Sequence, residues 1–141
     1  MEESLTYLKE QFELPDVDVK SYSPLVLAYI GDGIYELVIR TAVVGQGNRQ
    51  ANALHKKTST YVKASAQAAM MEAILEDLTE EELAVYKRGR NAKTVSMAKH
   101  ATMHDYRHAT GFEALMGYLY LKEDYSRIVE LVRKGIPEEN L

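Results

Sequence analysis

The chain contains no cysteine, so a disulfide framework, a thiolate metal site and a thiol nucleophile are all excluded. No Gly/Ser/Pro-rich linker, internal repeat or low-complexity tract divides the 141 residues, and we expect one folded domain over 1–141. No apolar run approaches the roughly 20 residues that cross a bilayer, and the N-terminus lacks the pattern of a signal peptide. These absences predict a soluble, cytoplasmic protein without a membrane partner.

Acidic residues are missing from two long segments, 37–71 and 83–104, although the net charge of the whole chain is −4. Both segments carry several basic side chains: Arg40, Arg49, Lys56, Lys57 and Lys63 in the first, and Lys87, Arg88, Arg90, Lys93 and Lys99 in the second. This segregation favours a local positive surface that binds a polyanion. Chance variation in charge among solvated helix faces is the alternative.

The alternation of apolar and polar residues that is typical of β-strands is also missing, while helical signals recur. The sequence therefore predicts an all-α fold. Ser23 is a good N-cap before Pro24, and Thr79 with Glu82 forms a capping box. Residues 16–22 and 88–93 are expected to be loops. Helices are expected over about 5–12, 24–45, from 48 through the alanine-rich stretch 64–73, 79–87, 105–121 and 124–134.

Two acids stand in nearly continuous apolar segments flanked by glycine. Asp32 lies between Gly31 and Gly33, and Glu113 lies in the segment 111–120. An ionised carboxylate in low dielectric costs several kcal/mol, so a cation, a metal or water is expected to meet it. If the two helices cross closely at their glycines, the pair forms an oxygen site suited to Mg²⁺, which keeps several of its waters.

Two alternatives to this acid site remain open. Glu36 shares a helix face with Asp32, and a simple pairing of Asp32 with an arginine, with Glu36 in solvent, explains an isolated acid pair. His100, His104 and His108 are spaced four apart, as in a zinc site, but the first and last lie about 12 Å apart on a straight helix. Basic-surface or RNA-contacting histidines fit better.

The last two expected helices carry more apolar and tyrosine residues than one buried helix face requires. This surplus indicates either a subunit interface or core packing. These residues are Tyr106, Leu115, Met116, Tyr118, Leu119, Tyr120 and Tyr125. Signature loops for nucleotides and the serine elbow of hydrolases are absent, which excludes covalent hydrolase and nucleotide-cofactor chemistry.

Two motifs together carry a family resemblance. Tyr29-Ile-Gly-Asp-Gly-Ile34 resembles the Phe-Leu-Gly-Asp centre of the ribonuclease III signature, and Phe112-Glu-Ala-Leu-Met-Gly-Tyr-Leu-Tyr-Leu121 resembles its downstream Glu-Ala-Leu-Ile-Gly-Ala-Ile-Tyr-Leu helix. The order matches, and the span covers most of the chain. The length is similar to that of the Mini-ribonuclease III subgroup, which has the helical catalytic domain without a double-stranded-RNA-binding domain.

The resemblance implies a Mg²⁺-dependent endoribonuclease, with Mn²⁺ as a substitute, that cleaves double-stranded RNA to 5′-phosphate products. It assigns metal-binding and catalytic roles to Asp32 and Glu113. It also implies a homodimer that matures the precursor of large-subunit (23S) ribosomal RNA, where a ribosomal protein that shapes the RNA is a further partner. The expected RNA contacts lie in the two basic segments: Arg88, Arg90, Asn91 and Lys93, with Lys56 and Lys57.

Part of the family's acid set is absent. Leu25 and Ala28 stand where full-length enzymes have glutamates, and Thr110 stands where they have an aspartate. We interpret this as a leaner metal shell completed by water and RNA phosphate oxygens, with roles for Glu36 and Thr110 left open. The alternatives are an inactive relative that binds structured or ribosomal RNA, and a helical nucleotide phosphohydrolase that uses His104 and Asp105.

Overall fold

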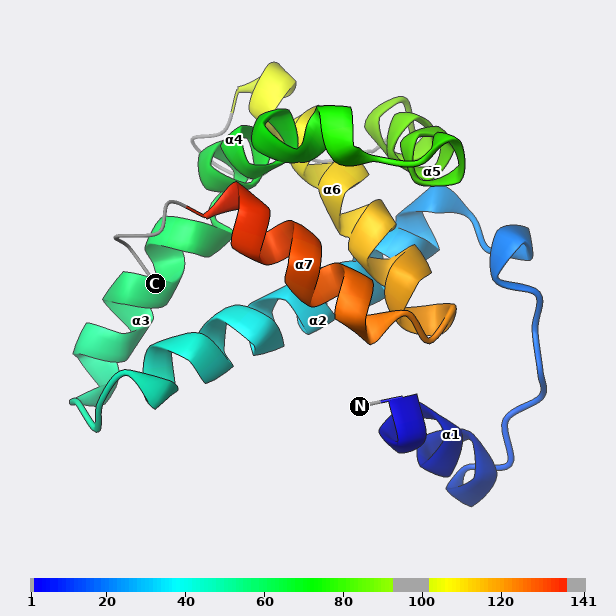
Figure 1. Cartoon of the computed structure of the whole chain (residues 1–141), viewed down its shortest axis with the longest axis horizontal. Coiled ribbons are helices and arrows are strands. Elements are labelled where there is room, and N and C mark those ends of the chain that lie inside the picture. The colour runs from blue at the N-terminus through cyan, green and yellow to red at the C-terminus, as the bar shows by residue number, and fades with distance from the viewer. Residues whose placement is uncertain (1, 93–101, 137–141) are drawn as a thin grey trace.

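The computed structural model of the protein describes residues 2–92 and 102–136, and within these ranges every regular element is a helix (Figure 1). The predicted all-α class is confirmed. None of the described helices has the length and apolarity needed to cross a membrane. The elements are α1 (Glu2–Gln11), η1 (Val19–Ser21), α2 (Pro24–Gly45), α3 (Ala51–Val62), α4 (Ala64–Ile74), η2 (Leu75–Asp77), α5 (Glu80–Arg90), α6 (Met103–Leu121) and α7 (Tyr125–Gly135).

Side-chain caps begin several of the helices that build the core, including α2 and α5. The hydroxyl of Ser23 accepts a hydrogen bond from the backbone N–H of Val26, and Pro24 occupies the first turn of α2. The predicted capping box of Thr79 and Glu82 is present at the start of α5. These caps satisfy backbone groups that a helix leaves unpaired at its N-terminus.

The expected long helix after residue 48 is wrong, because the chain forms two helices, α3 and α4, that meet at Lys63. Lys63 has an extended backbone with ψ of 156° and serves as the C-cap of α3 and the N-cap of α4. The turn lets α4 pack against the central helix α6 instead of continuing the direction of α3 (Figure 1). Helix propensity alone contains no signal for this break, because tertiary packing imposes it.

The predicted loop over 88–93 is also wrong in its first half, since α5 continues to Arg90 and Asn91 is its C-cap. Gly89 is buried because α5 packs closely on α6: a Cβ at this position would lie 2.8 Å from Cβ of Ala114. The glycine therefore permits a helix contact here and does not make a turn. Residues 93–101, which include Lys93, lie outside the described residues.

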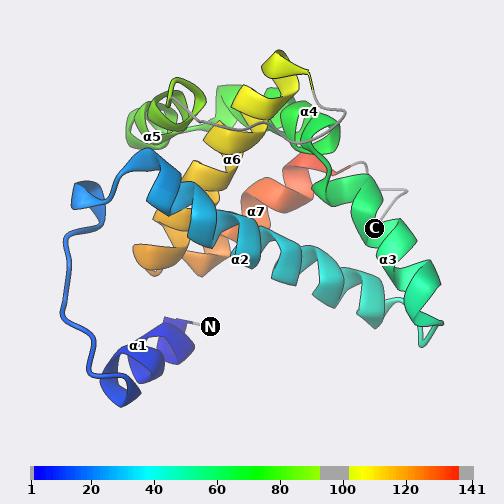
Figure 2. The same cartoon turned by 180° about the vertical axis from the view of Figure 1, so that it is seen from behind.

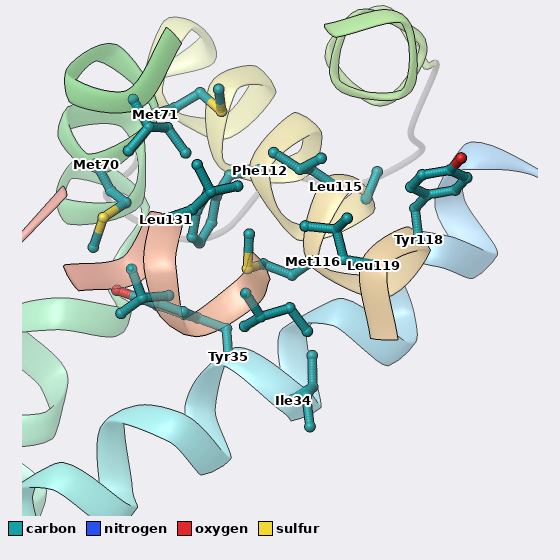
Figure 3. Packing of buried hydrophobic residues seen from close by; sticks show 14 of the residues in the cluster. Ile34, Tyr35, Met70, Met71, Phe112, Leu115, Met116, Tyr118, Leu119 and Leu131 are labelled. Atoms are coloured by element: carbon teal, nitrogen blue, oxygen red, sulfur yellow. The ribbon is translucent and has the colours of Figure 1, made fainter. Parts of the chain in front are cut away.

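Helix α6 forms the centre of the molecule and packs against α2, α4, α5 and α7 (Figures 1 and 2). Leu115, Met116 and Leu119 are completely buried in the core (Figure 3). Core packing thus accounts for Leu115, Met116, Tyr118 and Leu119, with Tyr120 and Tyr125 packed against the core, because a central helix is covered on nearly all sides, whereas Tyr106 is half-buried outside the core.

The crossing of α2 and α6 is a backbone contact at two glycines. A Cβ at Gly31 would lie 1.7 Å from the carbonyl oxygen of Glu113, and one at Gly117 would lie 1.9 Å from the carbonyl oxygen of Leu27. Any side chain at either position would hold the two helices apart. The close helix crossing that the proposed acid site requires is therefore present.

Candidate active site

The α2–α6 crossing places the two candidate acids side by side. Asp32 directly follows Gly31, whose missing side chain lets the backbone of Glu113 approach α2. The carboxyl groups of Asp32 and Glu113 are within hydrogen-bonding reach of each other. Two residues 81 positions apart in the chain thus present their oxygens to one location.

Asp32 is exposed, contrary to the expectation that its apolar helix would place it in a low-dielectric interior. Only one side of α2 packs against α6 and its neighbours, while the other side leaves apolar residues in contact with solvent. Tyr29, one turn before Asp32, is 82% exposed. Among the described residues no cation lies within ion-pair distance of Asp32, so the alternative of an arginine partner is not supported there.

Glu113 is the more buried acid, and burial is the largest cause that raises its pKa to about 8. The hydrogen bond and the negative charge of Asp32 raise the pKa further, whereas a hydrogen bond from Gln67 acts in the opposite direction. Two carboxylates in contact do not both ionise readily. A bound divalent cation would remove that repulsion, and the donor set suits a hard ion that prefers oxygen ligands.

Among the residues that the structure describes, no further acid joins this pair. No group of three or more His, Cys, Asp or Glu side chains within 2–92 and 102–136 is arranged to hold a metal ion. Glu36 lies 3.6 Å from Arg40, measured from Oε1 to Nη2, and Thr110 donates its hydroxyl to the carbonyl of Tyr106 at 2.9 Å. Two carboxylates fit Mg²⁺ only if water and phosphate oxygens complete the shell.

The histidines form a different cluster near the start of α6. The ring centroids of His104 and His108 lie 4.2 Å apart, and the hydroxyl of Tyr86 forms a hydrogen bond with Nδ1 of His108. Burial lowers the pKa of His108, with smaller contributions from the positive charges of His104 and Arg90. The side chain of His104 is 74% exposed and lies beside Asp105, so this pair lacks the enclosed setting of a phosphohydrolase centre. His100 lies outside the described residues.

The predicted RNA-contacting residues that the structure describes belong to α5 with its C-cap and to α3, and these two helices lie toward opposite ends of α2 (Figures 1 and 2). Arg88 is exposed in the last turn of α5, and Arg90 stacks over the ring of Tyr86 and donates from Nε to Oδ1 of Asn91 at 3.2 Å. A cavity of about 370 Å³ next to them is lined by Gly89, Arg90, Asn91, Ala92, Met103, Tyr106, Arg107 and Thr110. Lys56 is exposed in α3, at the opposite end of α2, and Lys57 donates to Gln46 (Figures 1 and 2).

Sequence patterns did not single out Gln67 of α4, although it contacts the candidate site. It is 2% exposed, and its side chain lies within hydrogen-bonding reach of the Glu113 carboxyl. The one available signal was a single long polar side chain in the alanine-rich segment 64–71, where a buried position calls for a defined partner.

Residues 25–124 match the Ribonuclease III domain family. This chain belongs to the ribonuclease III family. It is 46% identical to Mini-ribonuclease 3 of Thermoanaerobacter sp. (strain X514) over 137 residues, covering 96% of each chain. It is 51% identical to Mini-ribonuclease 3 of Enterococcus faecalis (strain ATCC 700802 / V583) over 128 residues, covering 87% of this chain and 97% of the relative. The resemblance to the Mini-ribonuclease III subgroup is thereby confirmed.

The ribonuclease III fold is shared with a solved structure as well. A crystal structure of a protein from Fusobacterium nucleatum superposes with a TM-score of 0.76 at 33% identity, covering 84% of this chain and 94% of that one. Ribonuclease III family members are endoribonucleases that act on double-stranded RNA, generally depend on a divalent metal and usually form dimers. The Asp32–Glu113 pair lies inside the matched range.

The paired acids of this ribonuclease III domain predict a specific pH dependence of stability. Without metal, the folded state keeps a proton on Glu113 up to a pKa of about 8, whereas the unfolded chain releases it near 4.5. Because the folded state binds more protons, stability is expected to fall between pH 4.5 and 8, by up to about 1.4 kcal/mol per pH unit from this group. Urea denaturation in EDTA measures it. The Glu113→Gln variant lacks this group, so a wild-type minus variant difference that stays constant with pH would contradict the assignment.

Proposed function

We propose that this ribonuclease III family member is a Mg²⁺-dependent endoribonuclease in which Asp32 and Glu113 hold the metal. The observation that carries the proposal is the meeting of the two carboxylates at the glycine crossing of α2 and α6. Ala28 is buried in the core and Leu25 contributes no oxygen, so no other side chain replaces the missing family glutamates at these positions. Water and phosphate oxygens complete the shell, and Mn²⁺ substitutes for Mg²⁺.

Each acid has its own task in this site. Asp32, exposed at the surface, would hold the metal on the side that faces an approaching duplex, while Glu113 would hold it from the partly buried side. When bound, Mg²⁺ supplies a Lewis acid for the scissile phosphodiester and lowers the pKa of a water that attacks in line. The resulting products carry 5′-phosphates.

Duplex RNA is recognised by shape and charge, because its shallow groove presents phosphates and 2′-hydroxyls. We assign the contacts to the basic residues of α5 and α3, with Arg88 as the exposed centre of one group and Lys56 of the other. The remaining contacts are Arg90, Asn91, Lys57 and Lys93. These groups lie toward opposite ends of α2, whose middle carries Asp32, so a duplex laid along α2 reaches both (Figure 2).

The exposed apolar side of α2 is the surface that we assign to the homodimer. Leu25, Val26, Tyr29, Leu37 and Val44 of this helix are each at least 40% exposed. Val26, Tyr29, Leu37 and Val44 lie on one side of the helix over about five turns, which makes this side of α2, next to Asp32, a largely apolar stripe. Pairing of two such stripes would place one acid pair on each side of the dimer.

Replacing Tyr29 by Glu is expected to convert the dimer to monomers, because it places a charge in the centre of the apolar stripe of α2. Sedimentation equilibrium at micromolar concentration measures the change, and we expect the dimer dissociation constant to rise at least about 100-fold, or about 3 kcal/mol. Leu75→Glu is the matched control, since Leu75 is 41% exposed in η2, away from the stripe. A dimer that persists in Tyr29→Glu would place the interface elsewhere.

The physiological substrate that we propose is the precursor of large-subunit (23S) ribosomal RNA, with a ribosomal protein that shapes it. The similarity to relatives named Mini-ribonuclease 3 supports this choice. The test of the activity is a labelled RNA duplex incubated with the protein, with and without Mg²⁺. Cleavage only with metal, giving 5′-phosphate ends, is the expected result. Binding without cleavage would instead support the inactive RNA-binding alternative.

A further inference from the structure

We infer that Gln67 is a positioning residue that holds the carboxylate of Glu113 in its metal-binding orientation; this rests on the proposed function. The inference begins with burial. Gln67 is 2% exposed, lies in the first turns of α4 and reaches two different helices through one side chain. A buried amide is retained at low cost only if its hydrogen bonds are made.

The two contacts of Gln67 are with α3 and α6. Its Nε2 donates to the carbonyl oxygen of Val62 at 2.8 Å, and its side chain lies within hydrogen-bonding reach of the Glu113 carboxyl. Val62 is the last residue of α3, so its carbonyl has no partner within its own helix. The amide is thereby anchored at a fixed point, the turn at Lys63, and from this anchor it contacts the carboxylate.

Gln67 faces the Glu113 carboxylate with its N–H groups, since this contact lowers the pKa of Glu113. Oε1 of Gln67 is buried and accepts no hydrogen bond from any residue within 2–92 and 102–136. The polar contacts that hold this side chain are therefore the hydrogen bond to Val62 and the approach to Glu113. Carboxylates that bind metals are generally held by such outer hydrogen bonds, and removal of one weakens metal binding about 10- to 100-fold.

A neighbouring hydrogen bond offers a matched control for a purely structural role. The hydroxyl of Tyr35 donates to the carbonyl oxygen of Tyr61 at 2.9 Å, next to the carbonyl that Gln67 satisfies. Tyr35 also packs its ring edge to face against Phe112, with the ring centroids 4.9 Å apart; both residues are labelled in Figure 3. Tyr35→Phe removes the hydrogen bond at the end of α3 but leaves Glu113 and its amide partner in place.

The experiment compares Mn²⁺ binding, measured by electron paramagnetic resonance, in wild type, Gln67→Met and Tyr35→Phe. Methionine fills a similar unbranched volume without amide protons. We expect the Mn²⁺ dissociation constant to rise about tenfold or more in Gln67→Met, and to stay within about twofold of wild type in Tyr35→Phe. Circular dichroism checks that each variant is folded, and Gln67→Leu replaces Gln67→Met if the latter does not fold.

The Mg²⁺ dependence of duplex cleavage gives a second readout. In Gln67→Met the Mg²⁺ concentration for half-maximal rate should rise about tenfold, with KM for the duplex unchanged. Equal Mn²⁺ affinity in wild type and Gln67→Met, or an equal loss in Tyr35→Phe, would overturn the positioning role alone. Unchanged Mn²⁺ binding in Asp32→Asn and Glu113→Gln would instead overturn the metal site itself and this inference with it.

Discussion

Replacing Asp32 by Asn, or Glu113 by Gln, is expected to lower the rate of RNA cleavage about 1,000-fold or more, since metal assistance contributes several kcal/mol and each 1.36 kcal/mol is a factor of ten. The acid set at the α2–α6 crossing consists of these two carboxylates, so neither has a substitute among the described residues. Single-turnover cleavage of a labelled duplex measures the loss.

The same two variants are expected to stay folded and to bind RNA. Asp32 is exposed and forms no ion pair with any residue that the structure describes, so Asn removes no ion pair there, and its amide keeps a polar group next to Glu113. Glu113→Gln removes a carboxyl whose pKa is raised mainly by burial and further by Asp32, and it should leave the metal-free protein at least as stable at pH 8. Affinity for the duplex in the absence of metal should remain within about threefold, because the basic residues supply most of it.

Glu36→Gln is the matched control for these substitutions. Glu36 lies one turn after Asp32 on the same helix, and its carboxylate faces Arg40. We expect cleavage within about threefold of wild type, because an exposed i,i+4 pair contributes only a few tenths of a kcal/mol. A loss comparable to that of Asp32→Asn would assign Glu36 to the metal site. Normal cleavage by both Asp32→Asn and Glu113→Gln would remove the proposed site altogether.

Replacing Gly31 by Ala is expected to destabilise the protein by about 3 kcal/mol or more, the upper range for overpacking. The added Cβ would lie 1.7 Å from the carbonyl oxygen of Glu113 and 2.7 Å from the backbone nitrogen of Gly117. Both neighbours are backbone atoms, so no rotamer change relieves the overlap and α2 must move away from α6. Urea denaturation at constant protein concentration measures the loss.

Gly33→Ala provides the opposite expectation on the same helix. A Cβ at Gly33 meets nothing within 4 Å, so the change only improves helix propensity. It should stabilise the protein by about 0.5–1 kcal/mol. The separation of the helices in Gly31→Ala should also part Asp32 from Glu113 and abolish cleavage, whereas Gly33→Ala should keep it. A Gly31→Ala variant as stable as wild type would show that the helices do not cross as closely as described.

Local chemistry determined a large part of this protein. The caps at Ser23 and Thr79, the position of Pro24 and the apolar periodicity were sufficient to predict the all-α class and most helix bounds. The two glycine-flanked acids and their surrounding motifs were sufficient to predict the family that the comparisons show. These features depend on residues within a few positions of one another, which sequence patterns record directly.

Tertiary structure alone decided the rest, because each remaining feature depends on helices that are distant in sequence. The break at Lys63, the continuation of α5 to Arg90 and the contact of Gln67 with Glu113 all arise from packing on α6. The exposure of Asp32 likewise follows from which side of α2 is covered. An apolar helix has the same composition whether its outer side faces solvent or another subunit, and only the arrangement of its neighbours separates the two.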